Sequence, residues 1–443
     1  MKSALTVVVI ILSLAAAAVA GAQTAAPAQE PPKPAPAPEA AKPPAQGLEF
    51  SIGDWKVKFY GFVRLDAHYD DSHPNNTQLI SFIRPEEELP LPTSAFEEEN
   101  SEDFTIHARL TRFGVDVNGP PVSMLGDARA MGKIEFDFLA NGGSEATTTS
   151  RGVIRMRLAY LKLSWEEISV LAGQNWDIFA PLLPSTSGEF SLWGAGNVGD
   201  RRPMVMGDFR RSFGDLTVIL QGGAGLGGAI DGENLDGSGT RDGEASGRPC
   251  FQGRAALKLA HPWVEKKSCE VGISGNIARE HLDTIPTAWT GEDEDDFACE
   301  ATAVDATIPI FDFLSVRGEV WWGRNANDLR GGIGQGVAFV DGDAGEVPSR
   351  GYWGEVLVKP LDWYTVGVGT SRDNPDNSRV SRTIAISPAS GAEDNRTGYL
   401  FNRFNVGAGL SFGLDYTHWI TKWRGGDYEG TDNRFSFFAQ YNF

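Results

Sequence analysis

The sequence predicts an all-β protein: a 16-stranded antiparallel transmembrane β-barrel with short periplasmic turns, long extracellular loops and an inward-folded third loop. Three observations predict this fold: segments that alternate apolar and polar residues, connections that alternate between long and short, and an aromatic last strand. With period two, successive side chains point to opposite faces of a strand. A membrane barrel needs one face for lipid and one for water.

The last strand shows the alternation most clearly. One face carries Phe435, Phe437, Ala439, Tyr441 and Phe443. The other face carries Arg434, Ser436, Phe438, Gln440 and Asn442. A soluble sandwich can alternate in the same way, but an ending on an aromatic residue resembles the closing strand of outer-membrane barrels. Phe438, on the polar face, has no explanation in this pattern.

Sixteen segments are predicted to be strands. They are residues 56–69, 104–118, 127–139, 152–164, 167–176, 202–211, 214–222, 251–260, 267–279, 297–309, 312–323, 351–359, 362–371, 397–408, 412–423 and 432–443. Long and short connections alternate, which places long loops at one rim and short turns at the other. An even number of strands closes the sheet without free edges. A phase slip within 104–118 predicts a bulge near Thr111 and Arg112.

The N-terminal part differs from the predicted barrel domain, residues 55–443. Residues 1–20 have a charged Lys2, an apolar run and a small-residue cleavage site, which predict a signal peptide. An uncleaved anchor is the alternative, although the apolar run is short for a membrane span. Residues 21–54 are predicted to be an Ala/Pro-rich periplasmic leader, either mobile or a spacer toward the cell wall.

The net charge and the positions of the tryptophans indicate which partners the chain can have. A formal net charge of −20 argues against nucleic acid as a partner, since phosphate binding needs a basic surface. Tryptophans lie near both ends of the strands: Trp165, Trp263 and Trp363 at the short turns, and Trp322, Trp353 and Trp423 at the long loops. Two interfacial belts are predicted, with clusters in a soluble core as the alternative. The predicted partners are outer-membrane lipid and lipopolysaccharide.

Acidic runs and cysteines are two further features. Acidic residues gather in the long loops, at 86–88, 97–99 and 292–296. They form either a solvated exterior or sites for divalent cations, between loops or on lipopolysaccharide phosphates; no other cofactor is expected. Of three cysteines, Cys250 and Cys299 fall near the same predicted rim and could pair. Three small buried side chains are the alternative.

Charged residues on predicted lumen faces, or at the end of the third long loop, are the candidate pore residues. They are Arg64, Asp66, Arg129, Lys133, Glu135, Arg155, Arg157, Arg201, Arg202 and Arg317. Such groups need water around them, which a lumen supplies. Fixed positive charge in a pore favours anions. Pairing with the acids could cancel that effect and leave cation preference or little selectivity.

The third long loop, residues 177–201, has an unusual composition for an exposed loop. It contains Phe179, Phe190 and Trp193 and few charges before Asp200. Exposing such a segment to water is unfavourable. We expect it to fold into the barrel and narrow it, with packing on a neighbouring protomer as the alternative.

Four short stretches resemble the DcaP-like trimeric porins of Gram-negative outer membranes. They are Tyr60–Asp66, Gly173–Trp176, Gly199–Pro203 and Asn433–Phe443. The resemblance covers the chain from about residue 55. It implies a sixteen-stranded homotrimer that passes small, often carboxylated solutes past a constriction containing arginines, and it assigns Arg64, Arg201 and Arg202 to the pore. Members of that family can carry an N-terminal coiled coil, whereas residues 23–46 are too rich in proline for heptads.

The resulting hypothesis is an outer-membrane porin, a passive diffusion channel for small hydrophilic, anionic solutes, and not an enzyme. The six histidines are scattered, and the sequence has no nucleophile elbow and no phosphate loop. The rival functions are an outer-membrane adhesin or structural anchor, and a barrel hydrolase that would use His418.

Overall fold

The computed structural model describes residues 48–86, 101–139, 152–187, 191–291, 293–380, 391–423 and 428–443. The predicted signal peptide and most of the predicted leader lie outside these residues. Within the described ranges, no helix has the length and apolar character needed to cross a membrane.

Strands make up most of the described chain. They are β1 Leu48–Ile52, β2 Trp55–Asp70, β3 Asp103–His107, β4 Arg112–Val122, β5 Ala128–Asp137, β6 Arg155–Ser164, β7 Ile168–Trp176, β8 Arg201–Phe213, β9 Leu216–Gly225, β10 Cys250–Ala260, β11 Ser268–His281, β12 Asp296–Phe311, β13 Leu314–Arg324, β14 Val337–Val340, β15 Asp343–Glu346, β16 Pro348–Leu361, β17 Tyr364–Pro375, β18 Ala392–Gly407, β19 Leu410–Trp423 and β20 Tyr428–Asn442. The helices are short: η1 Ser123–Leu125, α2 Asp242–Ala245, η3 Asn327–Leu329 and η4 Gly332–Gly334.

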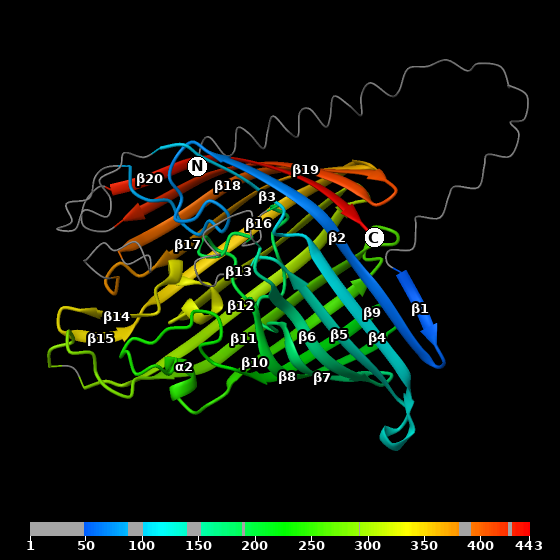
Figure 1. Cartoon of the computed structure of the whole chain (residues 1–443), viewed down its shortest axis with the longest axis horizontal. Coiled ribbons are helices and arrows are strands. Elements are labelled where there is room, and N and C mark those ends of the chain that lie inside the picture. Colours follow the sequence, from blue (N-terminus) through cyan, green and yellow to red (C-terminus); the bar gives the residue numbers. More distant parts are fainter. Residues whose placement is uncertain are drawn as a thin grey trace, which may run out of the picture. The chain divides into compact units, whose positions relative to one another are not determined.

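The sheet closes on itself. From β4 onward each barrel strand pairs antiparallel with the next, while β14 and β15 form a separate hairpin in a long loop. The last strand, β20, pairs with β2 from Phe62↔Asn442 to Tyr69↔Phe435 (Figure 1). β3 and β4 lie along the same side of β2 and together count as one barrel strand. The described residues therefore confirm the predicted barrel of 16 antiparallel strands.

The break between β3 and β4 is the predicted irregularity near Thr111. β3 pairs with Asp66–Asp70 of β2, and β4 pairs with Lys56–Phe62. Between them, Thr111 Oγ1 accepts a hydrogen bond from Arg64 N (3.1 Å) and donates one to Arg64 O (3.3 Å). The Thr111 side chain thus replaces the missing backbone partner of Arg64. Between β3 and β4 the apolar residues shift from even to odd positions, and the backbone of Arg64 keeps its hydrogen bonds.

Side-chain exposure separates the two faces of the barrel wall. On β20, Phe435, Phe437 and Tyr441 are exposed on the outside, as expected for lipid contact. Arg434, Ser436 and Phe438 alternate with them and are buried on the inside. The predicted faces of the last strand are confirmed.

The described chain begins with a strand where the sequence predicted leader. Leu48–Ile52 forms β1, which pairs with the start of β2 from Leu48↔Phe59 to Ile52↔Trp55. Its residues alternate between apolar and polar, and Gly53 supplies the positive φ of 59° for the tight turn. Strand structure therefore starts seven residues before the predicted domain boundary at residue 55.

The tryptophan belts are only partly as predicted. Trp165, Trp263 and Trp363 are exposed at the short-turn rim, and Trp322 is exposed near the other rim. Two predicted members of the second belt are wrong, because Trp353 and Trp423 point inward and are buried. The Trp353 indole donates to Glu319 Oε2 (3.1 Å), and that of Trp423 donates to Ile83 O (3.3 Å).

The suggested pairing of Cys250 with Cys299 is also wrong. All three cysteines are free, and β11 lies between Cys250 on β10 and Cys299 on β12. Strands two positions apart are separated by about 9.6 Å. A disulfide needs Cα atoms within about 7 Å of each other.

Thiol labelling should follow this burial. We expect a maleimide to modify Cys269 in the folded protein, and to reach Cys250 and Cys299 only after unfolding, because those two side chains are buried. Mass spectrometry of labelled peptides measures this. Equal labelling of the three thiols before unfolding would contradict the described core.

Candidate functional site: the third loop and the lumen wall

The third long loop lies inside the barrel, as predicted. Phe179 and Trp193 are buried, and Phe190 lies outside the described residues. Phe179 packs with Val198, Cys250 and Trp321 in one interior cluster. The apolar composition of this loop is therefore explained by contacts with the inner wall of its own barrel.

Wall side chains hold the outgoing arm of the loop through its backbone. Five backbone N–H groups of the loop each donate to an acceptor on a different wall strand. The pairs are Ile178 with Gln252 (2.8 Å), Ala180 with Ser274 (3.1 Å), Leu182 with Glu319 (2.8 Å), Ser185 with Glu355 (3.0 Å) and Ser187 with Asp415 (2.6 Å). The loop thus crosses the wall from β10 to β19 with these groups satisfied.

Two arginines hold the tip of the loop. Arg64 of β2 donates to Ser187 O at 2.7 Å, and Arg403 of β18 donates to Ser185 O. Each arginine also pairs with a wall carboxylate, Arg64 with Asp66 (2.5 Å) and Arg403 with Asp415. We call Arg64, Arg403 and Phe438 the tip clamp.

The two arginines explain why an aromatic residue, Phe438, lies on the polar face of the last strand. Its ring lies between the two guanidinium groups, 4.2 Å from Arg64 Cζ and 5.3 Å from Arg403 Cζ. Arginine over an aromatic face is attractive and leaves its N–H groups free for other partners. The apolar residue on the wet face is thus a platform that orients both arginines.

The returning arm of the loop makes equally close contacts with a wall strand and with η3, which follows β13. Gly196 O accepts from the Trp321 indole (2.9 Å), and Gly199 N donates to Leu329 O (2.8 Å). At Gly196 the φ angle is 116°, and a Cβ would lie 2.2 Å from Tyr352 O. Only glycine allows this approach.

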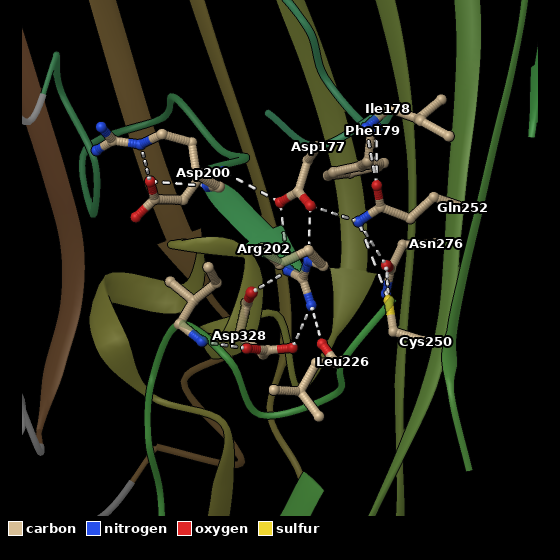
Figure 2. A network of polar contacts seen from close by, with 12 residues as sticks. Asp177, Ile178, Phe179, Asp200, Arg202, Leu226, Cys250, Gln252, Asn276 and Asp328 are labelled. Carbon is tan, nitrogen blue, oxygen red and sulfur yellow. Dashed lines mark hydrogen bonds and ion pairs between the residues drawn. The ribbon is translucent and has the colours of Figure 1, made fainter. Parts of the chain in front are cut away.

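Arg202 is the hub at the base of the loop (Figure 2). It pairs with Asp177 (2.6 Å) and Asp328 (2.8 Å), and its guanidinium also donates to Leu226 O (3.0 Å). Arg202 and Asp177 are almost completely buried, and burial raises the pKa of Asp177 although Arg202 opposes this. The assignment of Arg202 to the pore is therefore wrong, because this side chain has no surface to offer a solute.

The Arg201 side chain is also largely covered by its neighbours. It pairs with Asp200 (3.1 Å) and lies over the Trp176 ring at 4.7 Å. Its side chain is 6% exposed. Of the three arginines that the family resemblance assigned to the pore, Arg64 has the most exposed side chain, at 12%.

The other predicted residues of the inner wall form a paired ladder across β4, β5 and β6. Arg155 pairs with Asp137 (2.6 Å), Arg157 with Glu135 (3.0 Å), and Lys133 with Asp116 (2.9 Å). The expectation that acids would pair with these cations is confirmed by the geometry. The wall is therefore neither a bare basic strip nor a bare acidic one.

Exposure is unequal within several pairs. The arginine side chain is 12% exposed and the acid 0% for Arg64–Asp66, and the corresponding values are 20% and 0% for Arg155–Asp137. Arg317 is 26% exposed and its partner Glu355 0%. Arg157 with Glu135 shows the reverse, at 4% and 10%. In most of these pairs the acid lies behind the cation, so positive charge faces the water.

Arg129, the remaining predicted residue, is exposed at the short-turn end of β5, far along the strand from Asp137.

A recess of about 300 Å³ opens in the wall on the short-turn side of Arg64. Its charged lining residues are Lys58, Arg112, Asp116, Lys133 and Glu135.

Sequence reasoning missed Arg403 and the acceptors of the loop backbone. Arg403 follows Tyr399 and Phe401 at alternate positions, and both of these are buried inside the barrel. The lipid-facing side of the last strand is aromatic in the same way, so the sequence of this strand did not single out Arg403 as a lumen residue. Glu355 and Asp415 are carboxylates inside predicted strands. They could have indicated that polar side chains of the inner wall bind the loop.

The acidic runs are only partly described. Glu87, Glu88, residues 97–99 and Glu292 lie outside the described residues. In the fifth long loop, Asp295 and Asp296 meet His281, with ligand atoms within 4.8 Å of one another. Both aspartates are exposed.

A closed barrel of sixteen antiparallel strands, narrowed by its third loop, is the fold of outer-membrane porins. Residues 43–201 match the family model described as DcaP outer membrane protein. That range contains two of the stretches on which the resemblance rested, Tyr60–Asp66 and Gly173–Trp176. The predicted resemblance is confirmed, and the chain is an outer-membrane barrel of the porin and channel type.

Solved structures show the same fold at low sequence identity. The outer membrane channel DcaP of Acinetobacter baumannii has a TM-score of 0.64 and 19% identity, covering 90% of this chain and 100% of that one. OmpT of Vibrio cholerae has a TM-score of 0.51 and 13% identity, covering 89% and 100%. An anion-selective porin from Comamonas acidovorans has a TM-score of 0.51 and 10% identity, covering 88% and 100%. A search of curated protein sequences found no match.

Proposed function

We propose that this protein is a passive diffusion channel for small hydrophilic anions, carboxylates among them. The observation that supports an anion preference is the unequal exposure within the lumen pairs, where Arg64, Arg155 and Arg317 cover buried acids. An anion passing the third loop meets guanidinium groups first. Fixed positive charge in a narrow pore lowers the barrier to anions.

The wall recess gives the proposal a place for a carboxylate. Arg112 and Lys133 lie there with Lys58, which has no ion pair among the described residues. Guanidinium groups bind carboxylates through paired hydrogen bonds. A monocarboxylate or dicarboxylate that pauses in this recess would remain close to the tip clamp.

Planar-bilayer recording of the purified protein tests the channel and its selectivity. We expect stable conductance steps and, in a salt gradient, a reversal potential of anion-selective sign. The absence of steps would favour an adhesin or anchor, and a cation-selective sign would refute the anion preference. Steps in groups of three would support the homotrimer, which, like contact with lipopolysaccharide and the absence of enzymatic activity, stays a prediction.

The substitution Lys58→Glu tests whether the charge of the recess contributes to ion selectivity. It should reduce the ratio of anion to cation permeability about two- to threefold, since it reverses one charge without breaking a described ion pair. Lys359→Glu is the matched control, because Lys359 is half exposed at a short turn beside Asp362. A change of equal size in both variants would show that the recess has no special role.

A further inference from the structure

Arginines gather on the outer face of the barrel, at the extracellular ends of four neighbouring wall strands. They are Arg324 on β13, Arg350 on β16, Arg372 on β17 and Arg396 on β18. Trp322, Tyr352 and Leu400 share the outward face of β13, β16 and β18 with them and are exposed. Because exposed tryptophan and tyrosine mark the edge of the membrane, these arginines lie at the level of the lipid head groups.

Two of these arginines face each other directly. Arg372 and Arg396 are opposite partners in the pairing of β17 with β18, and like charges opposite one another destabilise a sheet. One carboxylate receives both, since Arg372 Nε donates to Asp394 Oδ1 (2.6 Å) and Arg396 pairs with Asp394 Oδ2. The Asp394 side chain is only 6% exposed, whereas those of Arg372 and Arg396 are 36% and 46% exposed. The acid therefore lies behind the two cations, and positive charge faces outward.

Arg350 adds a third positive charge to this face. It lies opposite Asn374, two residues along β17 from Arg372, so Arg350 and Arg372 are diagonal neighbours. Arg350 is exposed and has no ion pair in the described part of the chain, although an exposed acid, Asp376, follows β17 nearby. We call Arg350, Arg372 and Arg396 the arginine triad. It sets three positive charges against one buried and one exposed carboxylate, on a chain whose formal net charge is −20.

An apolar groove borders the triad on the same outer face. Its volume is about 1030 Å³, and Arg350 belongs to its lining. Gly253 and Gly275 are opposite partners on β10 and β11, and they leave two adjacent positions of the groove without side chains. Phe251 and Ile277 form the neighbouring pair toward the extracellular rim and are exposed at the edge of the groove. A groove of this size and character can take a lipid-sized ligand.

We propose that the arginine triad and this groove bind lipid A, the phosphorylated and acylated anchor of lipopolysaccharide. Guanidinium groups bind phosphate through paired, charge-assisted hydrogen bonds, and basic clusters at a membrane surface recognise anionic lipid head groups. A phosphate between Arg372 and Arg396 would remove the repulsion between them, and acyl chains would lie against Phe251 and Ile277. Arg350 belongs to both the triad and the groove, so one molecule can occupy them together.

Lipid A suits this surface better than a second copy of the chain, because it joins negative charge and apolar chains in one molecule. The proposal gives the predicted lipopolysaccharide partner a defined surface. It does not depend on the solute or on channel activity.

Native mass spectrometry of the full chain in detergent, titrated with bisphosphorylated lipid A, tests the proposal. We expect saturable binding by the wild-type chain, and binding about tenfold weaker for lipid A from which both phosphates have been removed. Arg350→Gln should also weaken binding of the bisphosphorylated form about tenfold, the loss expected for one charge-assisted hydrogen bond. This variant breaks no ion pair in the described part of the chain and should fold. Arg372→Gln with Arg396→Gln should have a larger effect, with circular dichroism as the check on folding.

A groove-filling substitution tests the acyl chains separately. Gly275→Leu should fold, because a Cβ at this position would meet Ala301 O at 3.7 Å, an ordinary contact. It should weaken lipid A binding about tenfold by taking the space of the acyl chains.

Arg210→Gln with Arg211→Gln is the matched control for the double variant of Arg372 and Arg396. These two side chains are 57% and 55% exposed at the short-turn end of β8, and the substitutions remove the same charge. The control should leave lipid A binding unchanged.

Three results would overturn the proposal. These are no saturable lipid A binding by the wild-type chain, an unchanged affinity in either arginine variant of the triad, or an equal loss in the Arg210 and Arg211 control. Equal binding by Gly275→Leu and wild type would overturn the place assigned to the acyl chains. If the triad variants kept lipid A but changed the oligomeric state in the same spectra, the face would be a contact between copies of the chain instead.

Discussion

Replacing Arg202 with methionine should lower the free energy of unfolding by about 3 to 5 kcal/mol. The substitution keeps most of the apolar stem but leaves Asp177 and Asp328 buried without their cation. Removing one partner of a buried ion pair typically has a cost of about this size. Denaturant unfolding of the refolded barrel in lipid vesicles, followed by tryptophan fluorescence, measures the change.

Arg210→Met is the matched control for that experiment. Arg210 pairs with Asp208 at 2.7 Å on the same strand as Arg202, but its side chain is 57% exposed. An exposed pair contributes only about 0–1 kcal/mol. Equal destabilisation by the two substitutions would show that Arg202 is not the hub of the third loop.

Removing the two arginines of the tip clamp should change permeation through the pore. With alanine at both Arg64 and Arg403, the loop loses two side-chain contacts to Ser187 O and Ser185 O. Asp66 and Asp415 stay in the wall without their cations. We expect a single-channel conductance about twofold or more above wild type, more current noise, and a reversal potential shifted toward cation preference.

Arg324→Ala provides the comparison for the clamp. Arg324 is half exposed at the extracellular end of β13 and pairs with Glu300 (3.0 Å). It should leave conductance and reversal potential unchanged. If the double variant of Arg64 and Arg403 also behaved like wild type, neither arginine would contribute to the constriction.

Much of the fold was predictable because strand periodicity and loop length are local properties. The phase slip at Thr111 was predictable for the same reason, since one inserted residue changes which side chains face lipid. Trp353 and Trp423 were placed wrongly because a residue near a strand end can face either way. Only their contacts with Glu319 and Ile83 settle the direction.

The candidate site was less predictable because its contacts join distant segments. Arg201 and Arg202 follow one another at the end of the third loop, and no local pattern distinguishes a lining arginine from a buried one. The difference comes from Asp328, which lies 126 residues away and reaches Arg202 only after the barrel closes. Arg64 was easier to place on the inner face because it alternates with apolar residues within a single strand.

The wall recognises the third loop by its backbone, at Ile178, Ala180, Leu182, Ser185 and Ser187. A loop held in this way can exchange side chains at these positions and keep its path. Its length is far more constrained, because one inserted or deleted residue would shift every later N–H away from its acceptor. Substitutions in this loop therefore offer a route to new solute preferences, whereas insertions would be expected to release the loop and enlarge the pore.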